Sequence, residues 1–442
     1  MQRWIRNAAL AASAVYLALG AVSCGSKRGA EKAGALNVAA FKGGYGLDFF
    51  EDAAKEFETE RPGTRVKVWG NPRVWEQLRP LFVAGKPPDL TYPGWGMDHW
   101  PLVYENQLMP LDEALAGKPW SGDGKWADTF EPALLKLGQH DGKQWMLPYF
   151  YNINGWWYDK ALFAKHGWTP PKTWSELLAL CAKIKAAGIA PITYQGKYPY
   201  YALHGFLFPW VVSAGGIQAF DDMQNLKPGA WKSAAVIRAA SMIRELADKG
   251  YFQSGSNGMS HTESQMEFVN GRAAMIPCGT WLNSEMREQL PKSGFEMAFF
   301  LPPTLDAGIG DPTNIDIGIE PWVVPSKGKN HGTAIDFYKY MTSLPKAKQF
   351  VERKGTLTAI KGSDEVKLPP FLVEPAAAFR ASKAIWSVEY IQWYPKLGTA
   401  SQNATAALLA GTVTPQEYAE RLEAAAELAR KDTETPRHTV TR

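Results

Sequence analysis

A tryptophan that follows a predicted strand is the most informative residue of this chain. The segment Met275–Trp281 is predicted to be an apolar strand that ends in a turn at Gly279 and presents the indole of Trp281. An indole in this position can lie flat against the C–H face of a pyranose, while its N–H still binds a hydroxyl. Pockets for small ligands combine such apolar walls with a few polar groups. Trp281 is therefore a candidate platform for stacking a sugar.

The chain as a whole is rich in aromatic residues, with 18 Trp and 12% aromatic residues among 442. Large rings also fill protein cores, so we expect most of these tryptophans to be buried. Being aromatic is therefore not enough to assign a ring to a binding site. A second feature, such as a position at a strand end, is needed for each ring.

Other kinds of chemistry lack their usual sequence patterns. The seven His show no metal-like spacing, no Walker loop is present, and Gly43–Gly46 lacks the GxGxxG fingerprint. The net charge of +4 comes from Lys and Arg that are spread along the chain rather than clustered. The sequence thus predicts no metal, no cofactor and no nucleic-acid partner.

The N-terminus has the three parts of a secretory signal. Arg3 and Arg6 precede the uncharged apolar run Ala8–Val22, and the segment Ala21–Cys24 resembles a bacterial lipobox. We expect residues 1–23 to be a signal peptide, Cys24 to be lipidated, and 24–35 to be a polar tether. The alternative is an ordinary signal peptide with an incidental cysteine. Later in the sequence no stretch is long and apolar enough to span a bilayer, so the body is expected to be extracytoplasmic and membrane-anchored.

The two remaining cysteines are predicted to be structural. Three Cys are too few for a disulfide framework. Cys181 lies on the apolar stripe of a predicted helix, and Cys278 lies at a strand end. A single disulfide between them stays open as an alternative.

The first 60 residues of the body alternate between strand and helix patterns. Periodicity predicts an α/β lobe in which ligands bind beyond the C-terminal strand ends, at 42–45 and 93–98. The predicted strands are Leu36–Phe41, Arg65–Trp69 and Asp89–Tyr92, separated by helices from Leu47 and over Val74–Val83. Pro80 is expected to interrupt or kink the second helix.

Farther along, Trp145–Tyr158 is predicted to be rich in strand. Capping boxes at Thr173–Glu176 and Thr414–Glu417 predict helix starts, and Thr262 is expected to open another helix.

Several short motifs occur in one order along the chain: Gly85–Asp89, Asn106–Asp112, Trp157–Trp174, Phe268–Met275 with Gly279–Trp281, and Gly411–Pro415. Together they resemble the segments that mark the extracytoplasmic solute-binding proteins of carbohydrate ABC transporters, and the resemblance covers about 36–431. Within that family, Phe41–Gly46, Arg79–Gly85 and Gln392–Pro395 are most similar to binders of N-acetylglucosamine and diacetylchitobiose.

This resemblance implies an α/β, two-lobed periplasmic-binding-protein fold of type II, with the ligand held between hinge-connected lobes. Residues 36–147 with 301–356 would form the N-terminal lobe, 148–300 with 357–431 the C-terminal lobe, and 432–442 a frayed tail. It further implies a monomer that captures a sugar and docks on the permease subunits of an importer with a cytoplasmic ATPase.

The resemblance also implies which residues contact the sugar. Trp281 matches the stacking position of the family, and seven further candidates come from loops and strands near the expected cleft. These are Tyr45, Trp95, Asp98, Asn152, His204, Trp210 and Trp393. For Asp98 a helix or loop cap, and for Asn152 a structural hydrogen bond, are alternatives of equal weight.

Two other functional classes remain as alternatives. A lipid-anchored glycoside hydrolase needs a carboxylate pair across the glycosidic bond, and Asp98, Asp316 and Glu320 are the acids that could supply one. A surface carbohydrate-binding module would bind sugar without hinge motion. Because no acidic pair is marked as a dyad, a non-enzymatic binding protein is the prediction.

Overall fold

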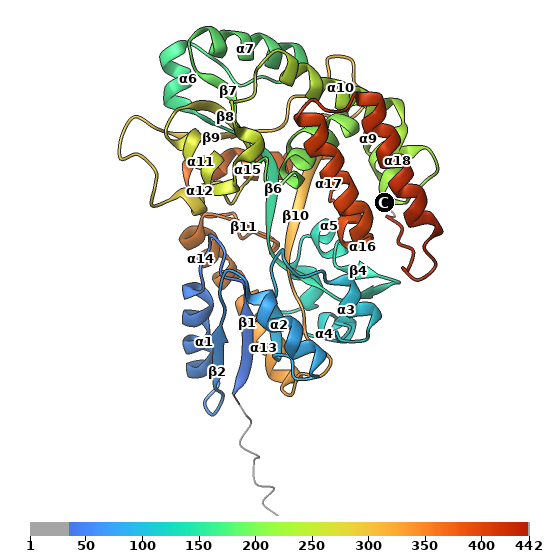
Figure 1. The fold of residues 1–442 in the computed structure, drawn as a ribbon. Helices are drawn as coiled ribbons and strands as arrows, with labels where there is room; N and C mark the ends of the chain where they lie inside the picture. Colours follow the sequence, from blue (N-terminus) through green and yellow to red (C-terminus); the bar gives the residue numbers. More distant parts are fainter. Residues whose placement is uncertain (1–34, 441–442) are drawn as a thin grey trace, which may run out of the picture. The chain divides into compact units, whose positions relative to one another are not determined.

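The computed structural model describes residues 35–440, which begin with a small parallel sheet (Figure 1). Its strand order is β2-β1-β3, formed by β1 (Leu36–Ala40), β2 (Val66–Trp69) and β3 (Leu90–Tyr92), with α1 (Asp48–Glu60) and α2 (Val74–Val83) as the connections. The predicted alternation of strand and helix is confirmed. Helix α1 forms because apolar residues recur on one face, and Phe49, Phe50 and Phe57 of that face are buried.

Helix α2 differs from the expectation at Pro80, since the helix continues through this residue to Val83. A proline removes the hydrogen bond to the carbonyl four residues earlier, here that of Glu76. Both Pro80 and Glu76 are exposed, so water can satisfy that carbonyl.

A second sheet is organised around one long strand, β6 (Leu147–Asp159), in which all but one residue is buried. Its first half pairs antiparallel with β10 (Ile315–Trp322) and β11 (Leu357–Thr358). Its second half pairs with β8 (Ala273–Gly279) and β9 (Met297–Phe300). Strand β12 (Ile385–Trp386) extends the sheet beside β10, and β7 (Ala190–Ile192) extends it beside β8.

The predicted lobe boundaries at 147/148, 300/301 and 356/357 lie at the start of β6, the end of β9 and the start of β11. The exact lobe boundaries stay a prediction.

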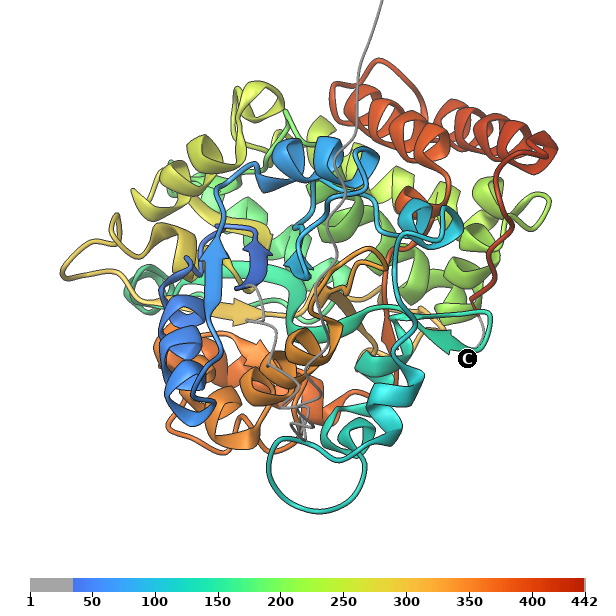
Figure 2. The ribbon, with the colours of Figure 1, turned by 90° about the horizontal axis from the view of Figure 1, so that it is seen from below.

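Helices cover both sheets and form most of the remaining structure. Figures 1 and 2 show α17 and α18 side by side near the C-terminus, while α13 packs on α1. The main covering helices are α6 (Lys160–His166), α7 (Trp174–Ala186), α9 (Phe208–Gln224), α10 (Ala234–Asp248), α11 (His261–Val269), α12 (Leu282–Met286), α13 (His331–Met341), α14 (Leu344–Lys354), α15 (Pro370–Ala381), α17 (Pro395–Leu409) and α18 (Pro415–Lys431).

Shorter helices complete the chain: α3 (Trp100–Tyr104), α4 (Asp112–Ala116), α5 (Pro132–Lys136), α8 (Tyr200–Ala202) and α16 (Tyr390–Trp393), with the hairpin β4 (Gln139–His140) and β5 (Lys143–Gln144). No described helix has the length and apolar character needed to cross a bilayer.

Helix starts follow the capping chemistry of the sequence. The boxes predicted at Thr173 with Glu176 and at Thr414 with Glu417 are both formed. For α11 the expected start at Thr262 is wrong, because Ser260 caps the helix and pairs with Glu263 instead. Serine and glutamate at this spacing satisfy two backbone N–H groups at once.

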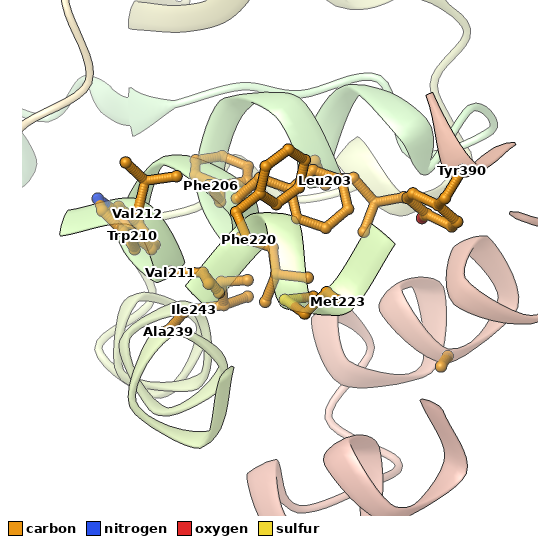
Figure 3. Packing of buried hydrophobic residues seen from close by; sticks show 14 of the residues in the cluster. Leu203, Phe206, Trp210, Val211, Val212, Phe220, Met223, Ala239, Ile243 and Tyr390 are labelled. Carbon is orange, nitrogen blue, oxygen red and sulfur yellow. The ribbon is translucent and has the colours of Figure 1, made fainter. Parts of the chain in front are cut away.

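Two groups of buried apolar side chains form the core. One lies among α7, α9, α10, α17 and α18, and the other joins β1, α1, β6, α13 and α14. Figure 3 shows part of the first, including Phe206 and Trp210, whose ring centroids lie 5.7 Å apart, and Phe220. Six tryptophans are almost fully buried: Trp126, Trp156, Trp157, Trp210, Trp231 and Trp322. Much of the aromatic content therefore fills the core.

The cysteines and the C-terminal segment complete the description. Cys181 and Cys278 are both buried and free, so the disulfide left open above is not formed. The expectation of a frayed tail is wrong for residues 432–440. Val440 exchanges backbone hydrogen bonds with the Asn225 side chain, and the His438 ring stacks on Trp393 at a centroid distance of 4.8 Å.

Gly70, after β2, provides a test of the first sheet. A Cβ at Gly70 would lie 1.7 Å from the carbonyl oxygen of Ala40, so Gly70→Ala forces β1 and β2 apart. We expect the substitution to lower the free energy of unfolding by about 1–3 kcal/mol, a typical cost of overpacking. Thermal denaturation followed by circular dichroism measures the effect.

Gly332→Ala is the matched control, because nothing lies within 4 Å of a Cβ at this position in α13. Alanine favours helix over glycine, so the Tm of this variant should equal or exceed that of the wild type. Equal Tm values for Gly70→Ala and wild type would contradict the close approach of β1 and β2.

Candidate functional site

A cavity of about 130 Å³ lies beside the central strand of the second sheet. Strand β6 contributes Asn152 and Asn154, β10 contributes Glu320, the turn after β8 contributes Trp281, and a π-helical turn over Leu203–Leu207 contributes His204. We call it the Trp281 cavity. It is lined by Asn152, Asn154, Gly155, Tyr200, Tyr201, His204, Gly205, Cys278, Trp281, Gly318 and Glu320. Three of the eight predicted contact residues, Asn152, His204 and Trp281, thus share one cavity.

The apolar wall of the Trp281 cavity consists of aromatic rings. The indole of Trp281 is partly exposed, and its centroid lies 6.1 Å from that of Tyr201. Tyr200 and Tyr201 lie 4.3 Å apart at 32°. Gly279 lets the indole fold back over the turn, because a Cβ there would lie 1.8 Å from the Trp281 ring. Such a wall has the flat apolar face that a pyranose packs against.

The polar wall is a chain of hydrogen bonds that joins five segments. The Tyr45 hydroxyl donates to Asn152 Oδ1 at 3.0 Å, and Asn152 Nδ2 donates to Glu320 Oε1 at 3.0 Å. On the other carboxylate oxygen, Glu320 Oε2 accepts from the Tyr92 hydroxyl at 2.6 Å. Thr280 Oγ1 also donates to Asn152 Oδ1 at 3.4 Å. Both oxygens of Glu320 are therefore held in place.

Glu320 has the most unusual electrostatics in this cavity. Burial raises the pKa of Glu320 to about 7, and the hydrogen bonds from Tyr92 and Asn152 only partly oppose this effect. Burial also raises the pKa of Glu285 on α12 and of Cys278 on β8. A carboxyl with a pKa near 7 exists in both protonation states at neutral pH.

His204 lies opposite and is oriented by Asp316. His204 Nδ1–H donates to Asp316 Oδ2 at 2.6 Å, and Asn154 Nδ2 donates to the same oxygen at 3.1 Å. With Nδ1 used in this way, Nε2 is the ring nitrogen left to accept a hydrogen bond.

Tyr45 does not line the cavity but supports it. Its side chain is buried, and its hydroxyl is used to hold Asn152. Asn152 itself is only 3% exposed and has partners on both its oxygen and its nitrogen. These hydrogen bonds favour a structural role for Asn152 over a direct contact with the sugar.

Trp95 and Asp98 lie on the loop after β3, as predicted, but away from this cavity. Trp95 is 62% exposed, and its ring packs on Trp75 at 4.9 Å. Asp98 is exposed just before α3. Neither residue contributes to the wall that contains Trp281.

The structure corrects the prediction for Trp210. It is fully buried, and its indole N–H donates to the Pro303 carbonyl at 3.0 Å. Its sequence neighbours are aromatic because this helix faces the core, so Trp210 is a core residue and not part of a cleft wall.

Trp393 lines a different and larger cavity of about 670 Å³, the Trp393 cavity. Its walls include Trp100, His140, Trp386, Glu389, Trp393 and His438. The imidazole of His438 lies nearly parallel to the Trp393 ring, at 9°. One face of this indole is therefore occupied by the chain's own tail.

Glu320 is the cavity residue that sequence reasoning undervalued. The sequence indicates it only as a possible acid of a hydrolase. The available signal was an acid near the end of the otherwise largely apolar strand Ile315–Trp322, whose other acid is Asp316. Among residues 35–440, no group of three or more His, Cys, Asp or Glu is placed to hold a metal ion.

Comparison with known proteins adds independent information. Residues 43–348 match the family model described as bacterial extracellular solute-binding protein. The diacetylchitobiose binding protein of Streptomyces coelicolor is 29% identical over 347 residues, which cover 78% of this chain and 73% of that protein. The multiple sugar-binding protein of Streptococcus mutans is 26% identical over 75% of this chain and 77% of that protein.

Among solved structures, a chitin oligosaccharide binding protein aligns with a TM-score of 0.71 at 25% identity, over 87% of this chain and 95% of that chain. The predicted α/β, two-lobed fold class is thereby confirmed.

Replacing Glu320 by Gln tests the electrostatics of the cavity. The raised pKa means that folding holds a proton on Glu320 between about pH 4.5 and 7, so ionisation lowers stability as pH rises through this window. Glu320→Gln should lose less stability than wild type between pH 5 and pH 8. The difference should be on the order of a few kcal/mol, because one pKa unit corresponds to about 1.4 kcal/mol.

Urea unfolding at the two pH values measures this difference. Glu113→Gln, which removes an exposed acid, is the control and should follow the wild type. If the free energy of unfolding has the same pH dependence in Glu320→Gln and wild type, ionisation of Glu320 does not lower the stability of the folded protein.

Proposed function

This chain belongs to the family of bacterial extracellular solute-binding proteins, and from this premise we propose that it captures a sugar beside Trp281 and delivers it to an ABC importer. The single observation that carries the proposal is the composition of the Trp281 cavity. Aromatic rings from Tyr200, Tyr201 and Trp281 face a hydrogen-bonded polar wall around Glu320. A sugar ring has one apolar C–H face and a rim of hydroxyls, which match these two walls.

The sugar that we propose is N-acetylglucosamine or a short chitooligosaccharide such as diacetylchitobiose. Support comes from the names of two similar proteins, one binding diacetylchitobiose and one binding chitin oligosaccharide. The relatives that match the chain are named as binding proteins, which favours a binding role over glycoside hydrolysis.

We further propose that ligand binding is coupled to hinge closure. The cavity of about 130 Å³ is smaller than the roughly 300–1,000 Å³ of typical ligand clefts, so the lobes must open for a disaccharide to enter before they close on it. Contacts with both walls would then favour the closed state, which the permease subunits recognise.

Export and anchoring complete the proposal. The signal sequence and Cys24 lie outside the described residues, and the proposal rests on their sequence pattern alone. A lipid on Cys24 holds the protein at the outer face of a membrane, where the permease lies. A monomer suffices for this role.

Substitution of Trp281 tests the binding site. Trp281→Ala should weaken binding of the preferred sugar at least about tenfold, since tenfold corresponds to about 1.4 kcal/mol and stacking provides that much. Calorimetric titration of the protein from Gly25 onward, with N-acetylglucosamine, diacetylchitobiose, glucose, maltose, cellobiose and xylobiose, measures the effect.

Trp95→Ala is the control, because Trp95 is exposed and lies outside the cavity; its affinity should stay at the wild-type value. Equal losses in both variants would place the sugar elsewhere. Absence of binding to every sugar of the panel by the wild type would refute the proposed function.

Substitution of Cys24 tests the anchor. In cells that express the full chain, Cys24→Ser should move the protein from the detergent phase to the aqueous phase of a Triton X-114 partition, because no acyl chain can be attached. Cys181→Ser is the control, since that cysteine is buried and should not alter partitioning. Unchanged partitioning of Cys24→Ser would show that this cysteine is incidental.

A further inference from the structure

Glu320 has acceptor capacity that its protein partners do not use. A carboxylate offers about four lone-pair positions, and the structure fills two of them, with Tyr92 and Asn152. The side chain lines the Trp281 cavity and is partly exposed to it. Asn152, by contrast, is buried and already accepts from Tyr45 and donates to Glu320. Of the two, Glu320 is the one able to receive hydrogen bonds from a ligand.

The surroundings of Glu320 contain acids and phenols but no cation. Three phenols interact with Glu320: Tyr92 on β3, Tyr45 after β1 and Tyr200 on α8. Next to Tyr45 and Tyr200 lie two further titratable groups, Glu285 on α12 and Cys278 on β8. No Lys or Arg is among the residues that line the cavity. Across the cavity, His204 is paired with a further buried acid, Asp316.

We propose that Glu320 is the specificity-determining residue of this site: it accepts hydroxyl or amide hydrogens of the bound ring and rejects anionic sugars. The inference rests on the proposed function. In it, Tyr92 and Asn152 are positioning residues that aim the carboxylate, and Trp281 supplies the stacking face. A ligand carboxylate or phosphate placed here meets Glu320 with no compensating cation, and this like-charge contact opposes binding.

The ionisation of Glu320 links affinity to pH. Donors on the ligand stabilise the carboxylate, so only the ionised fraction of the protein is competent to bind in this way. Because burial raises the pKa of Glu320 to about 7, that fraction falls about tenfold between pH 8 and pH 6, and the apparent affinity falls with it. Removing the Tyr92 hydroxyl removes a hydrogen bond that favours the carboxylate, which moves the midpoint of the profile to higher pH.

Calorimetric titration with diacetylchitobiose at several pH values between 6 and 8 tests this role. Wild type should lose about tenfold in affinity from pH 8 to pH 6. Glu320→Gln should bind at least about tenfold more weakly than wild type at pH 8 and show no pH dependence. Tyr92→Phe should keep the pH dependence with a shifted midpoint, which a merely structural defect would not produce.

Glu389→Gln is the matched control, because Glu389 is also an enclosed acid but lines the Trp393 cavity. It should keep the wild-type affinity and pH profile.

A second titration tests the rejection of anionic sugars. N-acetylglucosamine 6-phosphate should bind wild type at least tenfold more weakly than N-acetylglucosamine, and this difference in affinity should be smaller in Glu320→Gln. Circular dichroism confirms that each variant is folded.

The outcomes separate this inference from the function on which it rests. If wild type binds diacetylchitobiose and Glu320→Gln binds it equally well with the same pH profile, the role of Glu320 is refuted while sugar capture stands. Equal affinity for the phosphorylated and unphosphorylated sugar would refute the rejection of anions. Failure of the wild type to bind any sugar of the panel would overturn both.

Discussion

The thirteen residues of β6 are shared among four partner strands, and the arrangement of everything else follows from this sharing. Its first half pairs with β10 and β11, and its second half pairs with β8 and β9. Asn152 and Asn154 lie near the change of partners, since β10 pairs with β6 as far as Ile153 and β8 pairs with it from Asn154 onward. The Trp281 cavity lies beside this change, which brings Glu320 of β10 and the turn after β8 together.

Local patterns predicted much of this architecture. The strand–helix alternation of the first sheet follows from periodicity, and Trp281 follows from the glycine turn that precedes it, since both signals are contained in a few adjacent residues. Asn152 and His204, which were inferred from family resemblance, line the same cavity as Trp281. That resemblance did not reveal that the Asn152 amide is occupied by Tyr45 and Glu320, because these partners are distant in sequence.

Burial was the property that the sequence could not predict for single residues. Trp210 and Trp393 lie in aromatic stretches that look alike, yet one is a core residue and the other lines a separate cavity. Glu320 was undervalued for the opposite reason. An acid near the end of an apolar strand is explained only by the phenol and amide that meet it, and these come from β3 and β6. Polar partners of this kind become visible only when the fold is known.

The packed tail has a practical consequence for how this protein is handled. Val440 is fastened to Asn225 of the α9 C-cap, and His438 is held among the rings of Trp393, Tyr104 and His140. An affinity tag or fluorescent protein fused at this end would therefore pull on a segment that is part of the folded core. Labels attached to exposed loop positions, such as those near Gly122, leave that segment undisturbed.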